Sequence, residues 1–145
     1  MEIGLKKLNG KAVVPAYGSP FAAGADLYAC IDGQIIIEPH KTAVIPTGIA
    51  VELPVGYAGL IYARSGLASK KGLAPANKVG VVDCDYRGEI KVALHNHSDV
   101  AQSVDAGERI AQFVITPYIT ADFVLKDELS QTVRGAGGFG STGSK

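Results

Sequence analysis

Short apolar runs interrupted by glycine, proline and aspartate recur along the chain, and stretches with the period of an amphipathic helix are nearly absent. The runs are rich in Val, Ile, Tyr, Phe and Ala and are bounded by turn-forming residues, a pattern typical of strands. The segment EIKVALH alternates polar and apolar residues, as a half-buried strand does. The pattern predicts strands at 3–7, 26–30, 35–38, 43–46, 49–53, 57–63, 79–82, 89–95, 102–104, 109–118 and 122–126.

One short segment, Ser65–Lys71, is a helix candidate. Many short strands with regular turns predict an all-β fold, for which a sandwich, a jelly roll and a closed barrel all remain open. The 145 residues fit one domain. No apolar run reaches the ~18 residues of a membrane span, and Cys30 and Cys84 stand too far apart for a zinc or disulfide framework. We therefore expect a reducing, cytoplasmic location without membrane contact.

The composition changes near the C-terminus, where Val133 and Phe139 are almost the only large apolar residues after Leu129. Five of the 18 glycines fall within nine residues of this tail, and glycine alone cannot hold a packed shape. The tail also carries an arginine fork, an aromatic ring and two hydroxyls at Arg134, Phe139, Ser141 and Thr142. A disordered terminus is one interpretation. The other, which we adopt, is a core at 1–129 and a flexible glycine-rich arm at 130–145 that closes over a ligand.

Arginine is scarce, with four Arg against ten Lys in a chain of zero net charge. This balance excludes the overall basic footprint of a general nucleic-acid binder. One of the four arginines, Arg64, precedes Ser65 and Gly66 at the start of the helix candidate. Free amides at a helix N-terminus attract anions, and the arginine fork would add to that attraction. The alternative is that Ser65 caps the helix and Arg64 is a surface residue.

The segment 80–88 predicts a hairpin with chemistry at its tip, because an apolar strand runs directly into two acids and an aromatic residue. Asp85 suits a turn. Asp83 follows a buried strand, where partial desolvation would suit a general base for water. Tyr86 could stack on a sugar or a base. A polar loop without chemistry is the alternative.

Further polar positions interrupt apolar segments. Asp26 suits either a hydrated Mg²⁺, which takes one or two carboxylates, or a turn at the start of a strand. Arg109 and Gln112 lie three residues apart, so on a regular strand they would face opposite sides. The histidines form no HExxH pattern, and neither a P-loop nor a GxSxG elbow is present.

Taken together, these segments resemble the trimeric, all-β deoxyuridine triphosphatases (dUTP diphosphatases) over essentially the whole chain. The resemblance is carried, in the family's order, by AGADLYA at 23–29, ARSGLA at 63–68, NKVGVVDCDYRGEI at 77–90, GERIAQFVI at 107–115 and RGAGGFGSTG at 134–143. It implies a jelly-roll (β-clip-type) subunit and a homotrimer that shares three active sites at its interfaces. It also implies Mg²⁺-dependent hydrolysis of dUTP to dUMP and pyrophosphate, which limits uracil incorporation into DNA and supplies dUMP for dTMP synthesis.

The resemblance also implies roles for single residues. Asp83 is similar to the base that activates the attacking water, and Asp26 to the acid that holds the hydrated Mg²⁺. Tyr86 is similar to the platform beneath deoxyribose, and Phe139 to a lid on uracil. The implied uracil reader is Asn77 with the hairpin backbone, including Gly80 and Val82. The implied phosphate ligands are Arg64, Ser65, Gly66 and Gln112, joined from the arm by Arg134, Gly140, Ser141 and Thr142. Arg109 either holds the site together or touches substrate.

Two other functions compete with this one. The dCTP deaminases share the fold but carry a catalytic Glu ten residues after the first Asp of the hairpin, where this chain has Ala93. A non-catalytic jelly-roll binding protein would not need the full set Asp26, Arg64, Asp83 and Arg134. We therefore expect dUTP hydrolysis.

Overall fold

The computed structural model describes residues 1–138, which form an almost entirely β-stranded body with one short helix among the described residues. The strands are β1 (Gly4–Lys7), β2 (Ala16–Tyr17), β3 (Ala25–Tyr28), β4 (Gln34–Ile37), β5 (Thr42–Pro46), β6 (Ile49–Glu52), β7 (Tyr57–Tyr62), β8 (Leu73–Pro75), β9 (Gly80–Val82), β10 (Lys91–Asn96), β11 (Gln102–Asp105) and β12 (Arg109–Pro117). The helix α1 spans Ser65–Lys71. Within 1–138 no helix is long and apolar enough to cross a membrane.

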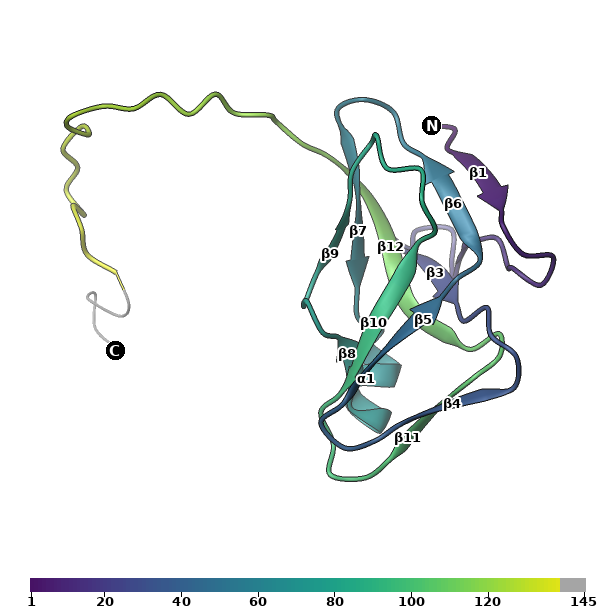
Figure 1. The fold of residues 1–145 in the computed structure, drawn as a ribbon. Coiled ribbons are helices and arrows are strands. Elements are labelled where there is room, and N and C mark those ends of the chain that lie inside the picture. The colour runs from purple at the N-terminus through teal and green to yellow at the C-terminus, as the bar shows by residue number, and fades with distance from the viewer. Residues whose placement is uncertain (139–145) are drawn as a thin grey trace.

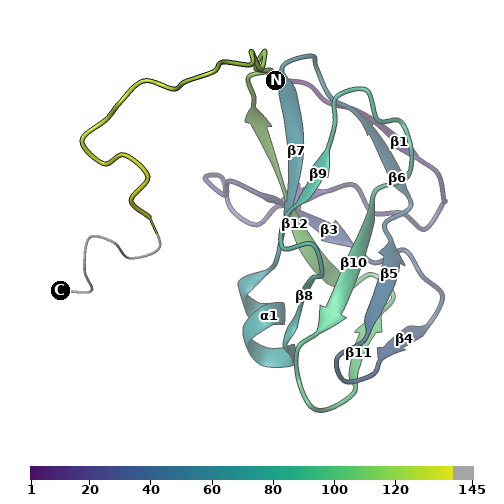
Figure 2. The same cartoon turned by 60° about the vertical axis from the view of Figure 1, so that its left-hand side comes forward.

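All strand pairs are antiparallel and build layers that face each other. The largest sheet has the order β2-β3-β12-β7-β9, and a second has the order β5-β10-β8. Two further strand pairs, β1-β6 and β11-β4, form two-stranded sheets. Figure 1 shows β5 and β10 in front of β12 and β7, and Figure 2 shows the same layers after a 60° turn. The all-β, jelly-roll type of subunit expected from the sequence is confirmed.

A continuous apolar core lies between the layers. Among its fully buried side chains are Leu27, Ile45, Leu73, Leu94 and Ile110. Close packing in this core leaves no room at Gly59 of β7, where a Cβ would overlap the ring of Phe113 on β12. Because Phe113 is itself buried, the glycine is what allows these two central strands to enclose the ring.

Most predicted strands are present with bounds shifted by a few residues, and α1 has the predicted bounds. The short strands β2 and β8 were not predicted, because two or three residues are too few to show an alternation. The strand predicted at 122–126 is wrong. Its side chains Phe123 and Leu125 are 94% and 98% exposed, and the segment pairs with no strand within the described part of the chain.

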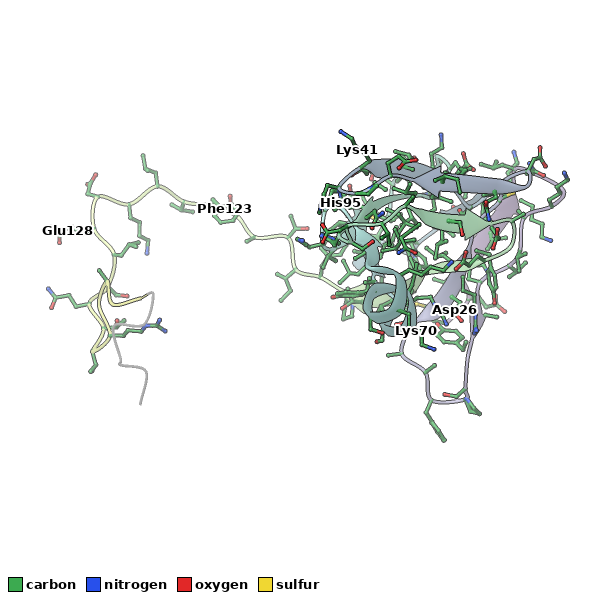
Figure 3. All side chains as sticks on the ribbon, turned by 90° about the horizontal axis from the view of Figure 1, so that it is seen from below. Asp26, Lys41, Lys70, His95, Phe123 and Glu128 are labelled. Atoms are coloured by element: carbon green, nitrogen blue, oxygen red, sulfur yellow. The ribbon has the colours of Figure 1, made fainter. Side chains whose placement is uncertain are left out.

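Beyond β12 the chain leaves the body. The N–H of Tyr118 still donates to the carbonyl of Gly56 at 3.0 Å, whereas every residue from 119 to 136 is exposed. Figures 1 and 2 show this segment extended away from the strands, and Figure 3 places Phe123 and Glu128 on it. The candidate arm residues Phe139, Gly140, Ser141 and Thr142 lie outside the described residues.

Candidate active site

The hairpin tip that follows β9 presents the first group of candidate residues. β9 is an edge strand that pairs with β7, and a Cβ at Gly80 would lie 3.2 Å from the Cβ of Ile61 on that neighbour. Asp83 comes directly after β9, and its carbonyl accepts the N–H of Tyr86 at 3.2 Å to close a turn. The side chain of Asp83 is exposed. The partial desolvation expected for it is therefore not found within a single chain.

A pocket of about 270 Å³ opens beside this hairpin. Its lining consists of Ile61, Asn77, Gly80, Val81, Val82, Asp83, Tyr86, Glu89, Ile90 and Lys91. The structure thus brings together the predicted base, sugar platform and uracil reader, and leaves the predicted phosphate ligands elsewhere. Glu89 and Lys91 were missed as pocket residues, because the alternation of their strand indicated only which side chains face outward.

The second group of candidate residues surrounds Asp26 on β3. This carboxylate is buried, at 5% exposure, and both of its oxygens are bonded. Oδ1 accepts from Nε of Arg64 at 2.8 Å, and Oδ2 accepts from Nη1 of Arg109 at 3.2 Å. Figure 3 shows Asp26 on the β-stranded body, away from the extended segment that carries Phe123 and Glu128. Two guanidinium groups around one carboxylate leave a local excess of positive charge, which suits an anionic ligand.

A β-bulge in β12 brings Arg109 to this cluster. One extra residue, Ile110, interrupts the pairing of β12 with β3, while Gln112 lies directly opposite Asp26. A bulge resets the alternation of side chains, so the side chain of Arg109 reaches the face that Gln112 shares with Asp26. The expectation that Arg109 and Gln112 face opposite sides assumed a regular strand and is wrong.

Arg64 also forms the N-cap of α1, with φ −87° and ψ 128° and without a side-chain capping bond. Ser65 is therefore not the cap, and Arg64 is paired and half-buried rather than a plain surface residue. Ser65 and Gly66 are exposed in the first turn of α1. Within residues 1–138 no partner occupies Nη1 or Nη2 of Arg64, so these donors are available to an anion.

The two groups lie far apart in one chain. β3 and β9 are separated by β12 and β7 in the sheet, and Asp26 and Asp83 also lie at different heights along the strands. The spacing of about 4.8 Å between strands and the rise of about 3.3 Å per residue separate these two backbones by roughly 20 Å. A single chain does not bring both carboxylates to one phosphate.

Tyr118, the residue that follows β12, contacts the hairpin. The Sγ of Cys84 and the hydroxyl of Tyr118 lie 3.4 Å apart, and this hydrogen bond raises the pKa of Tyr118. Farther along, Nε of Arg134 donates to the carbonyl of Gly137 at 2.8 Å. Arg134 is exposed on the extended segment and therefore does not meet either group of candidate residues in the single chain.

The all-β body thus offers a small pocket beside a carboxylate and a separate arginine-rich cluster that suits an anion. The family profile described as dUTPase matches residues 10–143. The chain is 48% identical over 141 residues to the deoxyuridine 5'-triphosphate nucleotidohydrolase of Syntrophotalea carbinolica, covering 97% of this chain and 96% of that one. It is 49% identical over 145 residues to the protein of the same name from a Hydrogenobaculum species, covering 100% of both.

A solved structure gives the same result. The dUTPase of Staphylococcus bacteriophage 80alpha with dUPNHPP superposes with a TM-score of 0.90 at 30% identity, covering 98% of each chain. The chain therefore belongs to the dUTPase family, and the resemblance found in the sequence is confirmed.

Proposed function

We propose that this protein hydrolyses dUTP to dUMP and pyrophosphate, so that it limits uracil incorporation into DNA and supplies dUMP for dTMP synthesis. Family membership and the names of its relatives support this function. The observation that carries the proposal is the pocket that gathers Asn77, Tyr86 and Asp83 along the backbone of β9. A candidate base reader, sugar platform and carboxylate on one pocket match the base, sugar and α-phosphate of a deoxynucleotide.

Recognition of uracil is assigned to the β9 hairpin. Because β9 is an edge strand, part of its backbone N–H and C=O groups, from Gly80 to Val82, lacks a strand partner within residues 1–138. Asn77 adds an amide close to Gly80, with Nδ2 3.5 Å from the position of a Cβ there. Backbone donors and acceptors at fixed spacing match the edge of uracil and reject that of cytosine, and the narrow pocket rejects the methyl group of thymine.

Binding of the triphosphate is assigned to Arg64, Ser65, Gly66 and Gln112. Arg64 is held by Asp26 through Nε alone, which leaves its terminal fork for phosphate oxygens. The exposed first turn of α1 adds the hydroxyl of Ser65 and backbone amides. Arg109 is bonded to Asp26, and we assign it to holding this cluster together.

The chemical step is assigned to Asp83. Its carboxylate accepts a proton from water as the water oxygen bonds to the α-phosphorus, and the bond from that phosphorus to the bridging oxygen of the β-phosphate breaks. The products are dUMP and pyrophosphate. The arginine cluster stabilises the charge that accumulates on the phosphates.

Mg²⁺ is proposed as the cofactor, with Asp26 as the acid that contacts it through water. Residues 1–138 contain no group of three or more metal-ligating side chains, so the phosphates themselves would supply most of its ligands. Each Asp26 oxygen bonded to an arginine keeps a second lone pair, which can accept a hydrogen bond from a metal-bound water. When bound, the ion neutralises phosphate charge. The solved structure of a related phage phi11 dUTPase is described with a structural Mg(II) ion.

A homotrimer with shared sites is proposed because one chain cannot complete the site. Asp26 and Asp83 are separated by roughly 20 Å across the sheet, so a neighbouring copy must bring one group to the other. The extended segment supports contact between copies, since Ile119, Phe123 and Leu125 are 93%, 94% and 98% exposed, and such apolar surface is normally covered. Light scattering should show three times 15.0 kDa. An active species of one chain would contradict this assembly.

The arm at 130–145 is proposed to close over the bound nucleotide of the assembly. Arg134, Gly140, Ser141 and Thr142 would contact the γ-phosphate, and Phe139 would cover uracil. Ordering five glycines costs backbone entropy, which ligand contacts must offset. This cost predicts an arm that orders with substrate rather than before it.

The proposed partners are dUTP and other copies of the chain, and the proposed location is the cytoplasm. Cys30 and Cys84 are free thiols, as a reducing compartment keeps them. Zero net charge gives no general attraction to nucleic acid or to a membrane.

Pyrophosphate release from dUTP, with dCTP assayed in parallel, tests the proposed function. Hydrolysis of dUTP and inertness of dCTP are expected. The deaminase alternative is opposed by Ala93, a half-buried residue of β10 without any acid–base group. Ammonia release from dCTP would favour that alternative, and binding of dUTP without turnover would favour a non-catalytic protein.

A further inference from the structure

The Tyr86 side chain makes two contacts with its own hairpin, one at its hydroxyl and one along its ring. Its hydroxyl donates to the carbonyl of Glu89 at 3.1 Å. The side chain is 46% exposed, yet it lines the pocket next to Asp83. The position of this ring therefore sets the width of the pocket on the side of the hairpin tip.

Glu89, which receives the hydroxyl, is tied to the turn between β5 and β6. Its Oε1 accepts the N–H of Gly48 at 2.9 Å. The next residue, Ile90, accepts from Oγ1 of Thr47 at 2.6 Å and donates its N–H to the carbonyl of Ile49 at 2.9 Å. Because Thr47 and Ile90 are each 1% exposed, these buried bonds hold the backbone of Glu89 and Ile90 in place, and with it the carbonyl that accepts the Tyr86 hydroxyl.

The Tyr86 side chain packs directly against the backbone of Gly88. A Cβ at Gly88 would overlap the hydroxyl oxygen of Tyr86 and lie 2.9 Å from Cε2 of its ring. Gly88 is not among the glycines with positive φ, so its backbone does not require glycine. The glycine at this position is explained by the Tyr86 side chain, which supplies the three atoms nearest to such a Cβ.

We propose that Gly88 is a specificity-determining residue that acts by positioning Tyr86. The missing side chain lets the ring lie against the hairpin, where it excludes nucleotides that carry a 2′-hydroxyl. This inference rests on the proposed function, in which Tyr86 lies beneath deoxyribose. A methyl group at position 88 displaces the ring rather than the backbone, because the half-exposed side chain can rotate and the tethered Glu89 cannot.

The test compares kcat/KM for dUTP and for UTP in Gly88→Ala and in the unmodified protein. The displaced ring should lower the dUTP-to-UTP ratio by about tenfold or more, the scale of one steric contact in a specificity pocket. Gly18→Ala is the matched control, since a Cβ there meets nothing within 4 Å, and it should leave the ratio unchanged. An unchanged ratio in Gly88→Ala overturns the proposal.

A double-mutant cycle separates the ring from general damage to the hairpin. In a Tyr86→Ala background the clash is absent, so Gly88→Ala should lower neither the ratio nor the Tm any further. If Gly88→Ala alone unfolds, the double variant should recover the Tm, and a double variant as unstable as the single one overturns the proposal. An unmodified protein that releases no pyrophosphate from dUTP instead contradicts the proposed function.

Discussion

At the scale of single residues, the two carboxylates differ in surroundings and therefore in expected role. Asp83 is exposed at the end of an edge strand, whereas Asp26 is buried between two guanidinium groups. An exposed carboxylate is open to water and substrate. A buried, doubly bonded carboxylate is suited to orienting its partners.

Asp83→Asn should keep the binding of dUTP and lose turnover, because the amide preserves the shape of the side chain but cannot accept the proton from water. Loss of a general base costs about 10²–10⁴-fold in rate. Steady-state pyrophosphate release and calorimetric titration with a non-hydrolysable dUTP analogue measure the two properties. Turnover within a factor of about two of the unmodified protein would remove Asp83 from the mechanism.

Arg109→Ala should weaken substrate binding because it leaves Asp26 with one of its two partners, so that Arg64 is held less firmly. Arg109 is half-exposed, with 52% of its side chain accessible. We therefore expect a modest loss of about 1 kcal/mol, which corresponds to about fivefold in KM for dUTP.

Kinetics and urea unfolding check the Arg109 prediction together. Lys11→Ala is a control, since the Lys11–Asp32 pair is largely exposed on both sides and such pairs contribute little. A variant of Arg109 that loses stability while KM stays the same would show that the bond serves the fold rather than the site.

At the scale of elements, β7 and β12 pack so closely that the position of Gly59 leaves no room for a side chain. Gly59→Ala places a methyl group against the buried Phe113 ring, which must shift to make room for it. Overpacking of this kind costs about 1–3 kcal/mol. Urea unfolding should show this loss, and Gly10→Ala, where a Cβ meets nothing within 4 Å, should show none.

The strand pattern was predictable because alternation follows directly from burial of one face. The bulge at Ile110 was not predictable from the sequence. One inserted residue leaves the apolar pattern of β12 unchanged, although it turns the side chain of Arg109 to the other face of the sheet. The segment 122–126 shows the converse limit. Its side chains suit a strand, but a strand also needs a partner, and residues 1–138 of one chain offer none.

The types and spacing of the residues predicted which positions along the chain carry the candidate site. They did not predict how these positions are arranged in space. The hairpin residues come together because they are close in sequence. The separation of Asp26 from Asp83 depends on the order of strands in the sheet, which local patterns do not determine. The role of Arg109 likewise emerged only from its bond to Asp26.

At the scale of the whole molecule, removal of 130–145 should leave folding intact and abolish most hydrolysis. Residues 130–138, the described part of the segment removed, contribute no side chain to the buried core, so the Tm should stay near that of the full chain. The loss of Arg134 and Phe139 should reduce kcat/KM for dUTP. Calorimetry and turnover on the same sample check this, and normal turnover would show that the arm is not a lid.

The separation of Asp26 and Asp83 has a genetic consequence. If each site takes Asp83 from one chain and Arg64 from another, two alleles that are inactive alone can complement each other. Random co-assembly of Asp83→Asn with Arg64→Ala chains would restore roughly one quarter of the sites. Conversely, a chain that carries both changes would disable sites of its normal partners, so such an allele would be dominant.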